Sequence, residues 1–436
     1  MSLQLLRQQT LRVLRGTLTC GLSALITNCR ALLGVTVMLL FASAAEAFDP
    51  GQVFSPKSGD VVPIPLIGID PDSGTTLGVI GAWLHHNEAD QVDRIIAPDV
   101  LHNSYFGWGL RGRILAYPSP DAEWSLIAGA KQRVEHKFDG EYQTGITREA
   151  PWSFAASAVD ERSGTQRFYG IGNDSPESAE SNYTTEHVLL QALVGRNFSP
   201  HWQLAYLVRF HSEDVTKGQL PDEPSITTTF PGLPGIGSNH ELLNRLMLVY
   251  DSRDSTAIPT RGVQAVAYTG LSSRGGIFND SLYSEVGIDA RGYFPFDRRT
   301  VLAMHVALRE LPSSHQLPFW AYSAIGGDAS FIGGSQPLRG FGLSRFVDVN
   351  SFSTSVELRR IIATMHVFET RIDLELAPFL DAGQVFSQPG ASPFAHLHHV
   401  LGFGARGIAR PFIVAYVDFG YGSEGTAGFS GINYIF

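Results

Sequence analysis

The sequence has 436 residues, of which 17% are charged and 44% hydrophobic, with 45 glycines and a formal net charge of −10. The acidic balance argues against nucleic acid as a partner. A mean hydropathy of +0.01, without a late run of about 18 or more apolar residues, argues against a helical membrane protein and favours a β-rich one.

The first 47 residues have the features of an export signal. Arginines precede an apolar core at residues 31–42, and an Ala-Glu-Ala cleavage site occupies residues 45–47. The core is too short to span a bilayer, so we do not interpret it as an anchor. Both cysteines, Cys20 and Cys29, lie in this segment. The mature chain is therefore predicted to contain neither a disulfide nor a reactive thiol.

Segments of alternating polarity, typical of strands, recur after the signal. In residues 371–381 the odd-numbered positions carry all of the charged side chains, and the even-numbered positions carry Ile, Leu and Pro. The same division appears at 203–211, 285–291 and 301–309. A soluble sandwich would show such alternation too. Strands of about ten residues, the export signal and a final Phe436 together favour an outer-membrane β-barrel.

Fifteen strands are predicted in this way, and bacterial single-chain barrels have an even number. We therefore expect one more strand between Lys137 and Asn182, sixteen in all. With both termini in the periplasm, residues 197–201 and 294–299 become short turns, and 213–241 and 311–350 become long outer loops. The expected organisation is a signal peptide (1–47), a short periplasmic segment (48–60) and an all-β, transmembrane antiparallel barrel (61–436). The predicted strands are 75–86, 104–117, 122–134, 153–161, 183–196, 202–212, 242–251, 260–271, 281–293, 301–310, 351–360, 371–381, 397–407, 411–420 and 426–436.

One loop motif stands out in the last third of the chain. Arg339 follows Pro337 and is surrounded by glycines, so a single charge is presented on a shaped loop. About forty residues later, Phe379, Asp381 and Gly383 share one face of an extended strand because side chains alternate with period two. We therefore expect Arg339 to reach Asp381 inside the barrel.

These residues resemble a known family. The segment Leu338-Arg339-Gly340-Phe341 is similar to the (V/L)-R-G-(F/Y) signature of the BamA/TamA superfamily of outer-membrane assembly and secretion barrels, and residues 379–383 are similar to its F-x-D-x-G strand motif. The resemblance implies that the arginine loop folds back into the lumen and pairs with the strand aspartate. Glu357, on the lumen-facing register of its strand, is a candidate second acceptor.

Other segments carry the same resemblance. A stretch resembling D-[ST]-R-D-x(4)-P-x-x-G lies between two predicted strands, where the resemblance implies a periplasmic turn motif. Residues 167–173 and the closing residues of the chain also fit, and the latter resemble a C-terminal barrel signal. The turn motif is Asp251, Arg253, Asp254, Pro259 and Gly262, and the C-terminal signal is Tyr434 and Phe436.

The family resemblance implies a function at the outer membrane. Members assemble, insert or translocate protein, so we expect outer-membrane lipids and an unfolded or exported protein client as partners; lipid is a second kind of cargo. Residues 48–75 leave no room for the POTRA domains that usually receive the client, so the chain resembles short, barrel-only members and a separate POTRA-bearing protein is a candidate partner. A weak seam between strands 75–86 and 426–436 would open toward the client. The alternatives are a passive pore for small solutes and a structural surface antigen.

No catalytic or cofactor motif is evident in the sequence. We find no G-x-S-x-G elbow, phosphate loop or H-E-x-x-H zinc motif. Of the histidines at 396, 398 and 399, only the first and second would converge on one face of a strand, without an acidic or cysteine ligand at metal spacing. We therefore expect no enzyme, no cofactor and no metal. A lipase with Ser and His on separate strands of a barrel is the enzymatic alternative.

Overall fold

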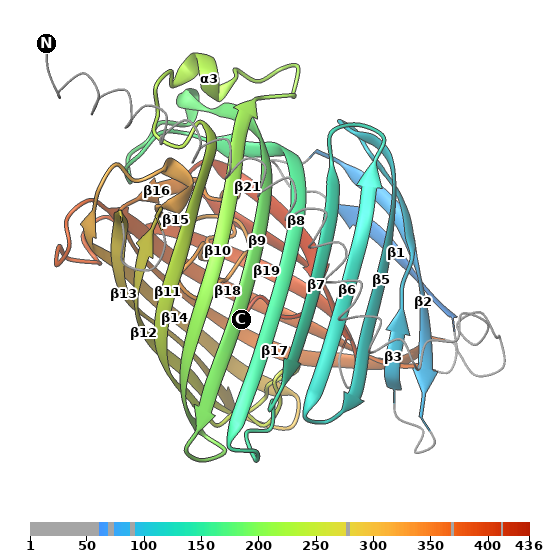
Figure 1. The fold of residues 1–436 in the computed structure, drawn as a ribbon. Helices are drawn as coiled ribbons and strands as arrows, with labels where there is room; N and C mark the ends of the chain where they lie inside the picture. The colour runs from blue at the N-terminus through green and yellow to red at the C-terminus, as the bar shows by residue number, and fades with distance from the viewer. Residues whose placement is uncertain (1–60, 69–73, 88–91, 276–279, 368–369, 411–412) are drawn as a thin grey trace, which may run out of the picture. The chain divides into compact units, whose positions relative to one another are not determined.

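The computed structural model describes residues 61–68, 74–87, 92–275, 280–367, 370–410 and 413–436. The predicted signal peptide and the predicted segment 48–60 lie outside the described residues. The described chain is an antiparallel β-barrel whose tilted strands follow one another around the wall (Figure 1). None of the helices among these residues is long and apolar enough to cross a membrane.

Among the described residues the main sheet contains 19 strands, and neighbours in space are neighbours along the chain. The loop between β14 and β17 adds a second, two-stranded sheet of β15 and β16. The strands of the first half are β1 (Val61–Gly68), β2 (Thr76–His86), β3 (Val92–Ile96), β4 (Asp99–Asn103), β5 (Gly107–Ser119), β6 (Ala122–Lys131), β7 (His136–Thr144), β8 (Trp152–Phe168), β9 (Ser181–Asn197) and β10 (Trp202–Lys217).

The second half of the chain completes the wall and forms the largest loop. In the part of the chain that the structure describes, the short helices lie in loops: η2 (Glu177–Ala179), α3 (Ile226–Thr229) and η3 (Phe319–Ala321). The remaining strands are β11 (Gly237–Asp251), β12 (Gly262–Ser273), β13 (Ser281–Pro295), β14 (Thr300–Ser314), β15 (Ser323–Ile325), β16 (Phe346–Asp348), β17 (Asn350–Val367), β18 (Thr370–Phe386), β19 (His398–Ala409), β20 (Ile413–Gly422) and β21 (Gly425–Ile432).

The predicted count of sixteen strands is wrong. Since β3 and β4 both pair with β2 and β5, they share one place, and the 19 strands fill 18 places. The strand expected after Lys137 is β7. The prediction missed β1, which contains Pro63 and Pro65, and the β3–β4 strand, which is interrupted before Asp99 by Pro98. Proline is a poor strand former, so these segments look like loops in the sequence.

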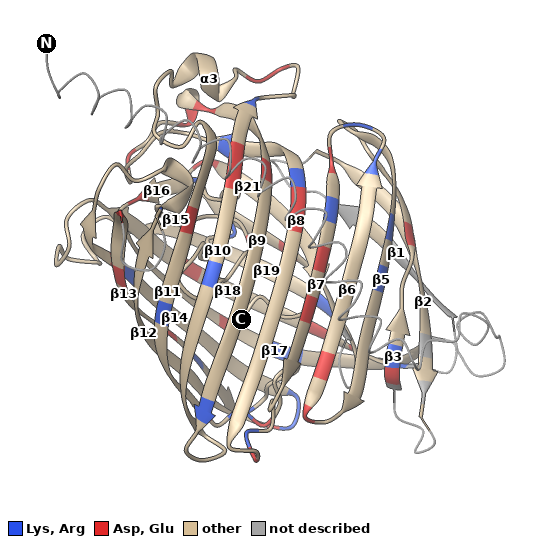
Figure 2. Ribbon diagram, viewed as in Figure 1, with Lys and Arg blue, Asp and Glu red and all other residues tan. Residues whose placement is uncertain are grey.

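The predicted separation of an apolar and a polar face is present in the wall. On β10 and β11 the outward side chains include Leu204, Tyr206, Leu246 and Leu248, all exposed, as suits a surface that contacts lipid. The inward face is polar: Arg245 of β11, for example, donates to Glu285 of β13. Charged residues accordingly recur along the strands themselves and not only in the turns (Figure 2).

The two ends of the sheet meet differently from all other neighbours. Every adjacent pair from β1 to β21 is joined by a ladder, whereas β1 and β21 lie near each other without a ladder among the described residues. The last strand is also shorter than predicted. It ends at Ile432, because Asn433 adopts a φ of +78° and turns the chain away from the strand direction.

Candidate functional site

The guanidinium of Arg339 lies at the centre of a buried ion-pair network. It donates to Asp381 through Nε (2.9 Å) and Nη2 (2.7 Å) in a forked pair, and the Arg339 main-chain N–H donates to the same carboxylate at 3.1 Å. Its Nη1 donates to Glu357 at 2.5 Å and to Asp418 at 2.8 Å. The side chains of all four residues are fully buried or nearly so. The structure thus brings Arg339 together with both acceptors expected from the sequence and with one more.

Three strands of the wall supply these carboxylates. Glu357 comes from β17, Asp381 from β18 and Asp418 from β20. Inward side chains recur every second residue of a strand, so the three acids point into the lumen at one level. Arg339 therefore links β17, β18 and β20 through ion pairs on the lumenal side of the wall.

Phe379 supports the arginine from the side of the wall. The guanidinium carbon of Arg339 lies 3.5 Å from the centre of the Phe379 ring, a cation–π contact. Phe379 pairs in register with Gly402 of β19, and its ring covers that glycine so closely that a Cβ at position 402 would overlap it. The space that β19 leaves at Gly402 is therefore what allows the ring to lie flat beneath the charge.

Two further arginines complete the network. Arg359 donates from Nε to Glu357 at 2.7 Å, and Arg406 donates from Nη2 to Glu357 at 3.0 Å. Arg406 also approaches Asp418 at 3.5 Å. The three carboxylates that Arg339 binds thus face three cations in a buried site, and Arg406 also lies 3.9 Å from a fourth carboxylate, Glu375. Because desolvation offsets most of the attraction in such a site, the network is better suited to select one conformation than to add net stability.

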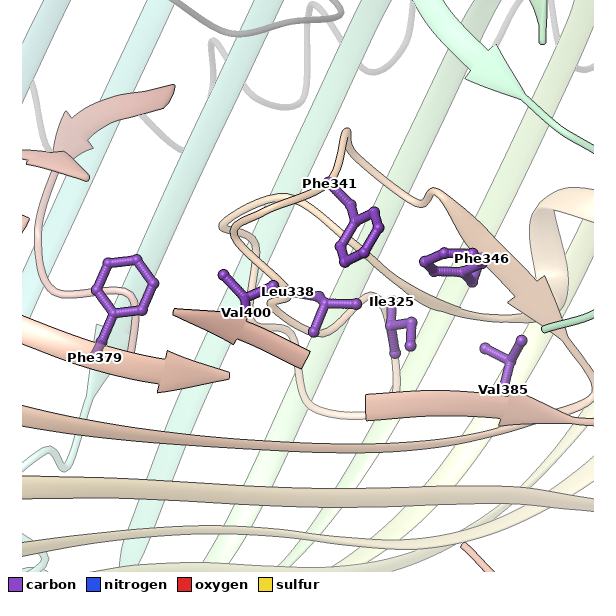
Figure 3. Close-up of a cluster of buried hydrophobic side chains, with 7 residues drawn as sticks. All are labelled: Ile325, Leu338, Phe341, Phe346, Phe379, Val385 and Val400. Carbon is purple, nitrogen blue, oxygen red and sulfur yellow. The ribbon is translucent and has the colours of Figure 1, made fainter. Parts of the chain in front are cut away.

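The apolar residues of the loop motif pack against the same wall. Leu338 and Phe341 are buried in a cluster with residues of the loop and of β18 and β19 (Figure 3). Gly340 lies so close to β20 that an added Cβ would stand 2.8 Å from the main-chain nitrogen of Gly422. Gly383 likewise lies beneath Ile325, with 3.2 Å between a built Cβ and Cδ1. The full cluster is Ile325, Leu338, Phe341, Phe346, Phe379, Val385 and Val400.

Arg345 anchors the same loop at a second point, nearer the end of the barrel that carries the long loops. Arg345 donates to Glu424, in the turn between β20 and β21, at 2.8 and 2.6 Å, and to the hydroxyl of Ser175 at 3.0 Å. The loop is therefore attached at two points to the last strands of the barrel, through Arg339 and through Arg345.

The histidines near residue 398 have structural contacts. The ring of His398 stacks on Phe346 at 3.8 Å between centroids, and its Nε2 lies 3.0 Å from the main-chain oxygen of Asn173. The main-chain N–H of His396 donates to Gln384. In the part of the chain that the structure describes, no group of three or more His, Cys, Asp or Glu side chains is placed to hold a metal ion.

The predicted turn motif forms a compact connection between β11 and β12. Asp251 accepts from the main-chain N–H (3.1 Å), Nε (3.0 Å) and Nη2 (2.8 Å) of Arg253. Asp254 accepts from the main-chain N–H groups of Thr260 (2.9 Å) and Arg261 (3.1 Å). Burial acts to raise the pKa of Asp254, but the hydroxyl of Thr260, which also donates to Asp254, and these main-chain donors outweigh it and hold the pKa below its ordinary value.

Pro259 and Gly262 close the same turn. Gly262 adopts a φ of +101°, and a Cβ there would collide with the backbone at Ser252 and Arg253. The contacts of the motif lie within residues 251–264, with Arg148 and His201 of neighbouring turns, and with Tyr293 of β13. Any role of the motif beyond shaping this turn stays a prediction.

The predicted C-terminal signal residues lie in the lumen instead of on the closing strand. The hydroxyl of Tyr434 donates to Glu375 at 3.1 Å, and its ring lies 3.9 Å from the guanidinium carbon of Arg359. Phe436 stacks on His305 at 5.2 Å, and its main-chain oxygen accepts from Arg359 at 3.0 Å. The left-handed residue Asn433 redirects the chain inward, so the strand predicted to reach Phe436 is corrected here.

The sequence analysis missed part of this site. Asp418, Arg406, Arg345 and Glu424 were not proposed, although Asp418 and Arg406 have a recognisable signal. Each is a single charge in an otherwise apolar or glycine-rich strand, at an inward position. An isolated charge of that kind predicts a buried partner.

One protein family and several solved structures are similar to this chain. The Omp85 superfamily domain matches residues 130–406, and no curated protein matches the sequence. BamA from Haemophilus ducreyi lacking POTRA domains 1–3 is similar with a TM-score of 0.48 and 14% identity, over 84% of this chain and 76% of that one. CdiB from Acinetobacter baumannii is similar at 0.44 and 13%, over 87% of this chain and 60% of CdiB. The Escherichia coli capsule-assembly protein Wzi, a carbohydrate-binding β-barrel, is similar at 0.38 and 11%, over 87% and 83%.

Proposed function

Since this chain belongs to the Omp85 superfamily, we propose that it helps polypeptides insert into or cross the bacterial outer membrane. The chain is an integral β-barrel of that membrane. Its role is non-enzymatic in this proposal: the barrel acts by presenting backbone and lumen to a protein client. A separate periplasmic protein with POTRA domains is the expected source of the client.

The observation that carries the proposal is the attachment of the Arg339 loop to the last strands of the wall. Arg339 connects β17, β18 and β20 from the inside, and Arg345 holds the turn between β20 and β21. A rearrangement of this loop therefore changes the support of the strands that end the sheet. In the proposal the buried network sets the conformation in which the end of the wall can receive a client.

The same loop weighs against a passive pore. Residues 315–349 place buried side chains, including Leu338, Arg339 and Phe341, across the lumenal face of β17 to β20. A wide aqueous channel would instead leave the lumenal charges hydrated. The pore therefore remains an outcome of the test below.

The proposal is tested by the folding rate of a urea-denatured eight-stranded outer-membrane barrel protein into liposomes that contain the purified protein. We expect faster folding than into empty liposomes, and loss of most of the acceleration with Arg339→Ala. Lys137→Ala, which removes a half-exposed lumenal charge far from the loop, is the matched control and is expected to behave as the unmodified protein.

One result would contradict the proposal, and a second would contradict the role that it gives to the Arg339 loop. Absence of acceleration together with steady ionic conductance would favour the passive pore. Acceleration that is equal for the unmodified protein and Arg339→Ala would keep a role in insertion but remove the Arg339 loop from it. Heat-modifiable migration in electrophoresis checks that each variant is folded.

A further inference from the structure

The outward face of β9 carries a charge at each end of an apolar run. Its outward side chains between residues 188 and 194 are all apolar, and the next outward residues on either side are Glu186 and Arg196. These two residues are about 33 Å apart along the strand, at about 3.3 Å per residue. A strand tilt of about 40° reduces this to about 25 Å along the barrel axis, which is the height of the apolar band of an outer-membrane barrel. Arg196 therefore lies at the level of the lipid headgroups.

Exposed apolar side chains of the two neighbouring strands surround Arg196. It pairs in register with Trp152 of β8 and Leu204 of β10, and all three side chains are exposed on the outside of the wall. The guanidinium carbon of Arg196 lies 5.2 Å from the centre of the Trp152 ring, a cation–π contact. Phe198 and Trp202, at the two ends of the turn that follows, are also exposed. Aromatic side chains grouped in this way are typical of the membrane–water interface.

Arg196 has no acidic partner among the residues that the structure describes. Its Nη1 donates to the main-chain oxygen of Pro151 at 3.1 Å, and no described carboxylate lies within ion-pair distance of it. A guanidinium carries five N–H donors, so most of those of Arg196 have no acceptor in the described part of the chain. The site thus offers a fixed positive charge and several donors to a molecule outside the protein.

Arg360 of β17 provides a contrast on the same outer face and at the same end of the barrel. It donates from Nη1 to the hydroxyl of Thr300 at 2.8 Å and lies 3.8 Å from a carboxylate oxygen of Asp297. Its charge is therefore matched within the protein, although its side chain is as exposed as that of a surface residue. The lack of such a carboxylate beside Arg196 is thus a property of that site and not of exposed arginines at this end in general.

The chemistry of a phospholipid headgroup complements this site. The turn between β9 and β10 is short, and outer-membrane barrels have short turns on the periplasmic side. A headgroup phosphate at that level carries negative charge and oxygens that match the fork of a guanidinium. The lipid-facing surface next to Arg196 is apolar, with Val194 and Phe154 exposed, and so suits the acyl chains of the same molecule.

We propose that Arg196, together with Trp152, binds the phosphate of an anionic phospholipid in the periplasmic leaflet of the outer membrane. The proposal goes beyond the proposed function, because the ligand is a lipid and not the polypeptide client. The site is also distant from the Arg339 loop along the sheet, since β10 to β14 separate β9 from β17. Lipid binding at Arg196 therefore does not require the buried network, and the two can be tested separately.

Native mass spectrometry of the purified barrel, titrated with dioleoyl-phosphatidylglycerol, measures the dissociation constant of the first bound lipid. We expect Arg196→Gln to raise this constant about fivefold, since one arginine near a headgroup contributes about 1 kcal/mol. Arg196→Lys keeps the charge and is expected to retain most of the affinity. Arg360→Gln is the matched control, because it removes an exposed arginine that already has a carboxylate, and it is expected to bind as the unmodified protein.

Two further measurements define the headgroup and the aromatic partner. Dioleoyl-phosphatidylcholine has the same acyl chains without a net charge, and we expect Arg196→Gln to leave its dissociation constant unchanged. Trp152→Leu keeps an apolar side chain and the charge of Arg196 but removes the ring beneath it, so we expect phosphatidylglycerol to bind about threefold more weakly. Heat-modifiable migration verifies that each variant is folded.

Three results would overturn the lipid site. Unchanged binding of phosphatidylglycerol to Arg196→Gln would show that Arg196 does not contact the headgroup. Equal losses for Arg196→Gln and Arg360→Gln would mean that the lipid responds only to net charge. A loss for phosphatidylcholine as large as that for phosphatidylglycerol would mean that the substitution disturbs the lipid face in general. None of these results bears on the acceleration of client folding, which tests the proposed function by itself.

Discussion

The inner charges on two sides of the barrel wall are similar in kind and different in environment. On β17 to β20, where the Arg339 loop packs, Glu357, Asp381 and Asp418 are fully buried against arginines. On β7 and β8, Lys137 pairs with Asp139 at 3.3 Å and with Glu161 at 3.2 Å, but its side chain keeps 38% of its surface exposed. The alternation of a strand thus decides which residues face the lumen, and on β17 to β20 the packed loop in addition removes water from them.

The largest effect is expected from Arg339→Ala, because it leaves three buried carboxylates facing two arginines. Removing one partner of a buried pair costs about 3–5 kcal/mol of the free energy of unfolding. Urea unfolding in lipid vesicles, followed by tryptophan fluorescence, measures this. Arg339→Lys keeps the charge but not the fork toward Asp381, so we expect a loss between those of the unmodified protein and Arg339→Ala.

A smaller effect on the same side is expected from Gly402→Ala. The added methyl group would displace the Phe379 ring on which Arg339 rests, and such overpacking costs about 1–3 kcal/mol. Gly407→Ala on the same strand is the control, because its Cβ would meet only Ile372 at an ordinary 3.8 Å. If both variants unfold at the same urea concentration, the Gly402 contact has no special importance.

On the side that the loop leaves open, Lys137→Ala is expected to change the free energy of unfolding by at most about 1 kcal/mol, since its ion pairs are hydrated. The same urea experiment measures it. A loss as large as that of Arg339→Ala would mean that the comparison between the two sides is wrong.

The smallest effect is expected in the turn between β11 and β12, which belongs to neither of the two sides compared above. Because the pKa of Asp254 is lowered in the folded chain, its hydrogen bonds stabilise the turn above the unfolded pKa of about 3.9 and are lost as the pH falls through the folded value. As the pH falls, the protection of the Thr260 and Arg261 amides against hydrogen exchange should therefore decrease more than that of other amides at this end of the barrel. Asp254→Asn should remove this pH dependence.

Much of the site was predictable because it depends on local geometry. Arg339 stands alone among glycines, and Phe379, Asp381 and Gly383 share a strand face by period two alone, so their convergence in a barrel could be expected. Asp418 and Arg406 were missed although each is an isolated inward charge. Their meeting with Arg339 depends on the register of β19 and β20, which no local pattern specifies.

The errors in the fold also have identifiable causes. β1 was missed because its prolines resemble those of a loop, yet Pro63 and Pro65 are tolerated where their nitrogens face a sheet edge. The last strand was predicted to reach Phe436 because Tyr434 and Phe436 continue its alternation. One residue, Asn433 with a φ of +78°, directs them into the lumen instead.

The sequence was enough to predict the fold class, the apolar and polar faces of the strands and the loop arginine, because each follows from side-chain alternation or from backbone freedom within a few residues. It could not predict which charges are buried together, how the terminal residues enter the lumen or which main-chain groups face the edge of the sheet. Those features depend on register and on the path of a long loop across the barrel, and both are set by contacts between residues far apart in the chain.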